Sequence, residues 1–387
     1  MQLDGIGRVQ SARIIRIGGG VAKEVSEVLA QLGLSRPLIV TDANLVALGH
    51  VQTVTEVLDA TNTVWSIFDE VVEDPTDVCV DAGLVAFRRG DFDCIIGLGG
   101  GSPMDTAKAI SFMSVNLGHV RDYKAPCQID RCGPPVILIP TTGGTGSELT
   151  RWCVITDTIK TEKYNLSGLA CVATAALIDW TFTVTKPWRI TADTAVDSLT
   201  HAIEAYVSRR AFPYADAFAL AAMPAIVQHV RQACKEPDDA QARSALMLAA
   251  CQAGMAFSNA SVALVHGMSR PIGAHFHVAH GLSNAMLLPE ITRFSVNAAP
   301  QRYATCARVM GWAETVDSDA QACEKLVENL GVLNADLKVP SPGDLGHIAR
   351  PGIFDLMASQ ALASGSPQNN PKIPTQEEIV QLYQKIW

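Results

Sequence analysis

Hydrophobic and polar positions follow two different rhythms along the chain. Up to about residue 187, short apolar runs alternate with segments of helical periodicity. The apolar runs predict strands at 38–42, 63–68, 94–99 and 136–142, and the periodic segments predict helices at 20–32, 76–89 and 103–115. Strands separated by helices are typical of a parallel, doubly wound sheet. The first part of the chain is therefore expected to be an α/β domain.

Beyond this point the strand pattern stops. The chain instead shows amphipathic helical periodicity, for example at 191–208 and 216–234. We therefore expect an α/β domain at 1–187 and an all-helical domain at 188–387. Because ligand clefts often form between domains, we expect the functional site there.

Composition narrows the class of protein. The 387 residues are 48% hydrophobic and 18% charged, which fits a large buried interior and two domains. The net charge is −9 and no run of Lys or Arg stands out, so we expect no nucleic-acid partner. We see no signal-peptide pattern and no apolar stretch of about 18 residues, so we expect no membrane partner. The ten cysteines form no C-x-x-C pair and are expected to be reduced thiols of a cytoplasmic protein.

A glycine-rich turn follows the expected strand at 94–99. In "CIIGLGGGSPMDTAKAI" the glycines allow close approach of a ligand, and Ser102 with Asp105 predicts a capping box at the helix start. Free N–H groups there attract an anion, most simply a pyrophosphate. The G-x-G-x-x-G pattern is not met, so the turn is either a phosphate site of another design or a capped turn without ligand. The candidate contacts are Gly99, Gly100, Gly101, Ser102 and Asp105.

A second stretch of small residues, "PTTGGTGSE" at 140–148, follows the next strand. It is either a plain loop or a second ligand loop, because loops after neighbouring parallel strands face one edge of the sheet. Its candidate contacts are Thr141, Thr142 and Thr145. Asp42 ends the strand at 38–42, where a carboxylate accepts from ribose hydroxyls and repels a 2′-phosphate. This position favours NAD over NADP, although a strand-end Asp is also common without a ligand.

Asp197 and His201 form the first candidate pair for a metal. Four residues apart on a helix, their Cβ atoms lie about 5–6 Å from each other. Their apolar neighbours indicate a partly covered face, where a carboxylate needs a partner such as a cation. A helix-surface pair without metal remains the alternative.

The segment "HGMSRPIGAHFHVAHG" at 266–281 supplies further histidines. In one straight helix His266 and His280 would lie about 21 Å apart. Pro271 and Gly273 allow the helix to stop and the chain to return, so that both histidines reach the first pair. The spacing leaves His277 with His280, or scattered histidines, as alternatives.

Four motifs together resemble the iron-containing (group III) alcohol dehydrogenase family, which includes lactaldehyde reductases and propanediol dehydrogenases. They are "GGGSPMDTAKAI", "PTTGGTGSE", "VDSLTHAIEAYVS" and "HGMSRPIGAHFHVAHGLSNAMLLP". The likeness runs from about residue 10 to the C-terminus. It implies a dinucleotide-binding α/β domain, a helical domain and a divalent metal in the cleft between them.

Taken position by position, the resemblance assigns roles to residues of this chain. The implied metal ligands are Asp197, His201, His266 and His280. The implied nucleotide contacts are Gly100, Gly101, Ser102, Thr141, Thr142, Thr145, Asp42 and Lys163. His275 and His277 match no ligand position.

The chain departs from the family pattern at two places. Arg270 stands where many members carry a further histidine, so the proton-relay role of that histidine does not transfer. Asp74 stands where an asparagine is common, so the cofactor contact of that asparagine does not transfer.

The resulting expectation is reversible hydride transfer between a small alcohol and NAD at Fe²⁺ or Zn²⁺, by a homodimer. A proton relay through water or His277 is a guess. Arg270 either holds an anionic group of a hydroxy or oxo acid, or pairs with a local acid or the cofactor phosphates. A metal-dependent lyase resembling dehydroquinate synthase is the alternative from another class.

Overall fold

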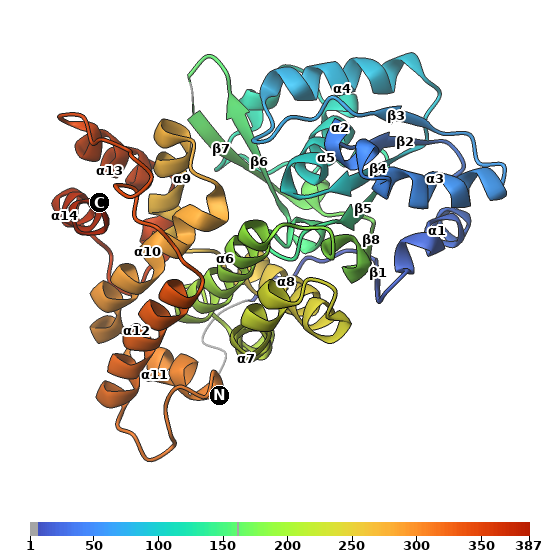
Figure 1. Cartoon of the computed structure of the whole chain (residues 1–387). Coiled ribbons are helices and arrows are strands. Elements are labelled where there is room, and N and C mark those ends of the chain that lie inside the picture. Colours follow the sequence, from blue (N-terminus) through green and yellow to red (C-terminus); the bar gives the residue numbers. More distant parts are fainter. Residues whose placement is uncertain (1–6, 161) are drawn as a thin grey trace. The chain divides into compact units, whose positions relative to one another are not determined.

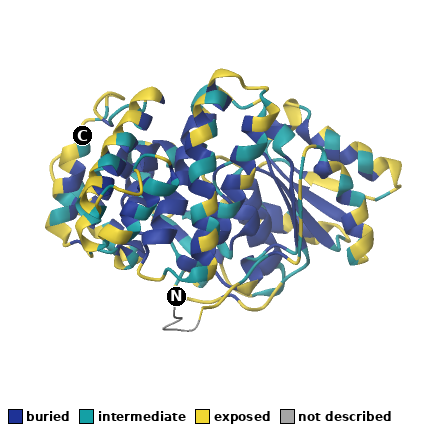
Figure 2. Ribbon diagram, turned by 90° about the horizontal axis from the view of Figure 1, so that it is seen from below, coloured by how far each residue is buried: buried dark blue, intermediate teal, exposed yellow. Residues whose placement is uncertain are grey.

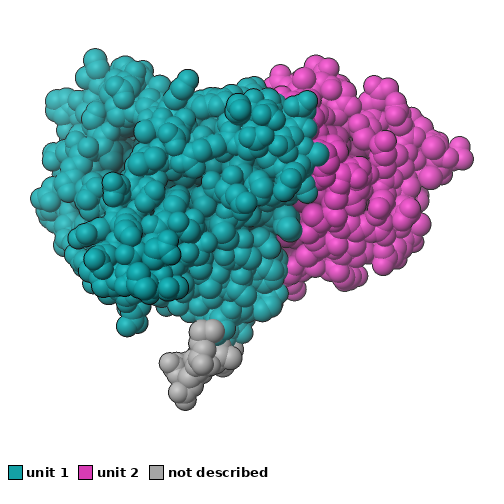
Figure 3. Space-filling view, turned by 60° about the horizontal axis from the view of Figure 1, so that its bottom comes forward, with its two compact units in different colours: residues 1–8, 187–387 teal, residues 9–186 magenta. Residues whose placement is uncertain are grey.

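The computed structural model describes residues 7–160 and 162–387, in two compact units (Figures 1 and 3). One unit is Val9–Lys186, and the other is Pro187–Trp387 together with Gly7 and Arg8. The division falls one residue before the expected boundary.

The first unit contains a six-stranded sheet in which all neighbouring strands are parallel. The strand order is β1-β8-β5-β4-β2-β3. The bounds are β1 Ile14–Ile17, β2 Pro37–Val40, β3 Ser66–Phe68, β4 Cys94–Gly99, β5 Val136–Pro140 and β8 Ala175–Ile178. The four predicted strands are all present, β3 shorter than expected. The strands β1 and β8, and the antiparallel hairpin of β6 (Trp152–Asp157) and β7 (Glu162–Ser167), were not predicted.

Helices cover both faces of this sheet. After the 3-10 turn at Val21–Glu24, helix α1 (Val25–Leu32) packs with α3 (His50–Ala60) on one face, sharing a core with Ile96 and Leu98 of β4. Helix α5 (Gly101–Val115) lies on the other, since a Cβ at Gly97 would approach Ala107 Cβ to 2.8 Å. The neighbouring helix α4 (Asp77–Arg89) shares a second core with α5 and the hairpin. The prediction of a doubly wound α/β domain is confirmed.

The second unit is helical throughout its described residues. Helix α6 is buried on nearly all sides and packs against α7, α8 and α10. Figure 2 shows the buried residues gathered in the interior and the exposed ones on outer helices and loops. The bounds are α6 Trp188–Val207, α7 Pro213–Lys235, α8 Ala240–Ala260, α9 Leu264–Phe276, α10 His280–Ser295, α11 Pro300–Val309, α12 Asp319–Asp336, α13 Ile353–Ala363 and α14 Gln376–Ile386. Within the described residues, no single helix meets the length and hydropathy needed to cross a membrane. Helices α8 and α9, bent by 104°, pass that test only as a pair.

A buried lysine connects α5 to the loop before β6. Lys108 is fully buried, and its Nζ donates to the carbonyl oxygens of Ser147 at 2.6 Å and Trp152 at 2.8 Å. It also lies 3.6 Å from Asp105 Oδ1. The bonds of Lys108 to these carbonyl oxygens fix the loop to the helix, and Asp105 on the same helix supplies the anion that a buried ammonium needs.

We expect Lys108→Met to destabilise the first unit by about 3–5 kcal/mol, because it leaves Asp105 buried without its cation. Scanning calorimetry should show the melting transition of this unit lowered by roughly 10 °C. Lys23→Met, which removes an exposed lysine of the same unit, should shift it by no more than about 1–2 °C. An unchanged transition in Lys108→Met would contradict the role given to the pair.

Candidate metal centre and cofactor site

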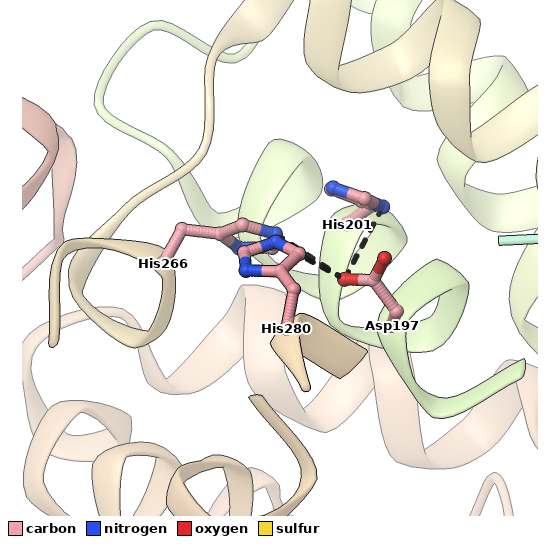
Figure 4. Close-up of side chains that lie close together, drawn as sticks. All are labelled: Asp197, His201, His266 and His280. Atoms are coloured by element: carbon pink, nitrogen blue, oxygen red, sulfur yellow. Dashed lines mark ion pairs between the residues drawn. The ribbon is translucent and has the colours of Figure 1, made fainter. Parts of the chain in front are cut away.

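Three helices of the second unit bring four potential metal ligands together. Helix α6 provides Asp197 and His201 one turn apart, α9 provides His266, and α10 provides His280. One ligand atom from each lies within 4.8 Å of all the others. The four side chains point toward one another (Figure 4). The two pieces of chain expected to converge therefore do so.

The distances within the cluster suit a first-row divalent ion. Asp197 Oδ1 lies 3.5 Å from His266 Nε2, 3.8 Å from His280 Nε2 and 3.9 Å from His201 Nδ1. Two ligands at about 2.1 Å from a tetrahedral ion are about 3.4 Å apart. A small contraction would bring the donors onto one ion, so the residues fit an iron-type or zinc-type site.

The cluster keeps its carboxylate charged. Burial alone would raise the pKa of Asp197, but the nearby His201 and His280 outweigh burial and hold that pKa well below its usual range. For the imidazole of His266 the directions are opposite. Burial alone would lower its pKa, but its bonds to Asp197 and Glu204 raise that pKa by more than burial lowers it. A charged carboxylate among imidazoles is the ligand set that a divalent cation requires.

One side of the cluster is open. Asp197 and His266 are each 2% exposed and His201 is 4% exposed, whereas the His280 side chain is 39% exposed. Catalytic metal sites keep a coordination position for substrate, whereas structural sites are closed. The uneven burial therefore favours a catalytic centre.

Glu204 is a site residue that the sequence reasoning missed. It is 3% exposed, and its Oε2 lies 2.7 Å from His266 Nδ1. Its two oxygens also accept from the backbone N–H groups of Ala263 and Val265, at the start of α9. A carboxylate on the far ring nitrogen fixes the imidazole so that Nε2 faces the ion. Its position one turn after His201 on the same helix was the available signal.

Asn284 was missed as well. It is fully buried one turn after His280, and its Nδ2 donates to Asp197 Oδ1 at 2.7 Å. The same nitrogen lies 3.2 Å from His266 Nε2 and 3.3 Å from His280 Nε2. The amide thus contacts the donor atoms of three of the four candidate ligands, at the lone pairs that an ion would use.

The bend that separates the two histidine helices differs from the prediction. Pro271 and Gly273 lie inside α9, which continues to Phe276; the helix ends at His277, whose φ is 55°. Pro271 removes one hydrogen bond from the interior of the helix without ending it. At Gly281 a Cβ would lie 2.5 Å from the carbonyl oxygen of Asp193, so glycine lets α10 approach α6 closely.

The other two histidines of the segment lie outside the cluster. His277 is exposed, and His275 Nε2 bonds to Gln360 Oε1 at 2.8 Å. The alternative pair of His277 with His280 is not the arrangement found. The relay suggested for His277 stays a prediction.

Arg270 lies one turn after His266 on α9. Its Nη1 donates to Ser366 Oγ at 2.9 Å, and no carboxylate of the described residues forms an ion pair with it. Among the described residues, Glu204 acts on it electrostatically without an ion pair, so pairing with a local acid or with the cofactor phosphates stays a prediction.

In the first unit, the glycine turn differs from the predicted capping box. Helix α5 begins at Gly101 and its N-cap is Gly100, which offers no side-chain cap. Ser102 and Asp105 therefore lie inside the helix. Gly99 adopts a φ of 153°, and a Cβ there would lie 2.5 Å from Pro103 Cγ, so glycine permits the earlier start. The amide groups at this end receive no side-chain cap and suit an anion.

The expected nucleotide turns lie together at one edge of the sheet. A Cβ at Gly99 would lie 2.9 Å from Leu45 Cδ1, and one at Gly101 would lie 3.2 Å from Thr145 Cγ2. From β2 the chain continues to β3 on one side, whereas from β4 it continues to β5 on the opposite side. The strand order therefore reverses between β2 and β4, and this is where open α/β sheets bind ligands. Among described residues, the hydroxyls of Thr141 and Thr142 are buried without a hydrogen-bond partner. Such a cradle fits a dinucleotide.

The three charged candidates of this unit are differently placed. Asp105 accepts from Ser147 Oγ at 2.6 Å and Val154 N at 2.9 Å, which positions the threonine loop. Burial raises the pKa of Asp105, although Lys108 opposes it. Asp42 uses Oδ1 to cap helix α2 (Ala43–Ala47) and keeps Oδ2 without a bond to described residues. Lys163 Nζ lies 2.7 Å from Asp74 Oδ1, so the carboxylate at 74 pairs with this lysine.

Comparisons with known proteins agree with this architecture. A model of the family described as "Iron-containing alcohol dehydrogenase" matches residues 12–180, and one described as "Fe-containing alcohol dehydrogenase family, C-terminal" matches residues 191–387. Together they span nearly the whole chain.

Similar proteins cover the chain along its length. The NAD-dependent methanol dehydrogenase of Bacillus methanolicus is 35% identical over 95% of this chain and 96% of its own length. The lactaldehyde reductase of Escherichia coli K12 is 36% identical over 96% and 97%, respectively. A crystal structure of a 1,3-propanediol oxidoreductase superposes with a TM-score of 0.95 at 33% identity, covering 99% of this chain and all of that one. The chain belongs to the iron-containing alcohol dehydrogenase family.

Proposed function

We propose that this chain interconverts a small alcohol and its aldehyde, with NAD as hydride carrier and Fe²⁺ or Zn²⁺ at the four-residue cluster. The observation that carries the proposal is the convergence of Asp197, His201, His266 and His280 on one point with an open side. The relatives support it, because they include an NAD-dependent methanol dehydrogenase and a lactaldehyde reductase.

Each group of residues has a distinct task in this proposal. The ligand cluster binds the ion, which when bound supplies Lewis acidity to the alcohol oxygen. Glu204 orients His266 through the ring nitrogen that does not face the ion. The glycine turn and the threonine loop would hold the cofactor, which would supply the acceptor for the hydride of the carbinol carbon, with the hydroxyl proton released to water. Assembly as a homodimer and location in the cytoplasm stay predictions.

We expect His266→Ala to lose bound metal and at least about 1,000-fold in kcat together, because it removes one of four donors at a buried site. Elemental analysis and NADH absorbance on an alcohol panel measure the two losses. His275→Ala removes a histidine of the same helix outside the cluster and should retain both metal and activity. Full turnover by the metal-free enzyme would refute the proposed function.

Glu204→Gln should weaken metal binding by about 10–100-fold, because the neutral amide supports the His266 ring less well than a carboxylate. Competition with a chelator gives the metal Kd independently of activity. Glu290→Gln, which alters a carboxylate on α10 paired with Lys385, is the matched control and should leave the Kd unchanged. A Kd equal to that of the wild type in Glu204→Gln would show that the contact does not tune the ligand.

Asp42→Ser should raise the ratio of kcat/KM for NADP to that for NAD by at least about 10-fold, because it removes the charge that repels a 2′-phosphate. Serine can still cap α2, so the helix start is retained. Steady-state kinetics with both cofactors measure the ratio. If the ratio does not move, Asp42 does not face the ribose.

A further inference from the structure

Arg270 is a cation whose bonding is incomplete. Of its five N–H donors, only one, on Nη1, has a partner among the described residues, namely the Ser366 hydroxyl at 2.9 Å. Burial lowers the pKa of Arg270 to about 10, which leaves it charged at neutral pH. The residue is nevertheless partly exposed, so its unpaired N–H groups are open to a ligand, and a shielded guanidinium favours an anionic one.

The surrounding charges do not supply that partner. Glu204 is the carboxylate that acts on Arg270 electrostatically. Its oxygens already accept from His266 Nδ1 and from two backbone N–H groups, and it forms no ion pair with Arg270. Within the described residues the guanidinium therefore has no protein anion in contact.

The position of Arg270 relates it to the metal cluster. It lies four positions after His266 on α9, so the two side chains share a helix face and start about 6 Å apart along the axis. The short 3-10 helix Ser366–Asn369 lies against the same helix, since a Cβ at Gly267 would approach Pro367 Cγ to 2.8 Å. The Ser366 hydroxyl, on a residue that is 5% exposed, thus anchors one edge of the guanidinium. The other edge is left to pair with two oxygens of one anionic group.

We propose that Arg270 binds an anionic group of the substrate, so that the enzyme acts on short hydroxy acids, with carboxylate or sulfonate, rather than on neutral alcohols. This inference rests on the proposed function. The reaction is the same as for a neutral alcohol. The carbinol C–H bond breaks with its electron pair going to the nicotinamide, and the O–H proton goes to water. The anionic group takes no part in bond breaking. The anion places the alcohol at the cluster.

Three alcohols test the proposal. In each of them two carbons connect the reacting hydroxyl to a terminal group, which is charged or neutral. They are 3-hydroxypropanoate, 2-hydroxyethanesulfonate and, as the neutral isostere, 1,3-propanediol. With the metal-loaded enzyme and NAD, we expect kcat/KM for at least one of the two anions to exceed that for the diol by at least 10-fold. The anion that is preferred identifies the carboxylate or the sulfonate as the group recognised.

Arg270→Ala should then lower kcat/KM for the preferred anion by about 100-fold, chiefly through KM, while changing the value for the diol by less than about 3-fold. Arg270→Lys should retain part of the preference, because it keeps the charge but loses the bidentate geometry. Arg231→Ala, which removes a surface arginine paired with Asp336, controls for net charge.

Several outcomes would overturn the inference. They are a wild-type preference for the diol, an equal loss on all three alcohols in Arg270→Ala, or a loss confined to the KM for NAD, which would assign the arginine to the cofactor. The wild-type comparison decides even if a variant fails to fold. Turnover of the diol alone leaves the proposed function standing, whereas no turnover of any alcohol by metal-loaded enzyme would overturn that function.

Discussion

A buried carboxylate among three imidazoles is the constraint on which the helical unit depends. Asp197 is 2% exposed, and a charge in that position is tolerated only with partners. Helices α6, α9 and α10 each contribute to its surroundings, and Asn284 donates to the oxygen that the histidines face. The packing of α6, α9 and α10 and the geometry of the cluster therefore depend on each other. A shift of one of these helices would separate the donors and expose or unpair the Asp197 carboxylate.

The α/β unit solves a different problem, that of holding an anion with backbone groups. Glycines at 99–101 let α5 begin without a side-chain cap, so its first amides stay available. The loop with the two buried threonine hydroxyls is held by Lys108 and Asp105, which are themselves buried. A charged pair inside the unit thus positions an uncharged cradle at its edge.

The sequence predicted the parts of this arrangement that depend on periodicity and residue type. The central strands, the long helices and the four clustered side chains follow from such patterns. Strands β1 and β8 were missed because β1 is half exposed and β8 is rich in alanine, so neither has a strong β signal. The α9 bend was misplaced because proline was read as a stop, whereas a left-handed His277 ends the helix. Glu204 escaped notice because a helical glutamate usually faces solvent.

Recognition of substrate and of cofactor is divided between the units. His266 and Arg270 lie on one helix, so the spacing between the metal ligand and the cation is set by the helical repeat. A substrate that spans the two is selected by its length and charge within the helical unit alone. The proposed cofactor contacts, in the turns that follow β2, β4 and β5, belong to the other unit. Preference for an anion and preference for NAD therefore have separate physical origins, and substitutions in one should leave the other intact.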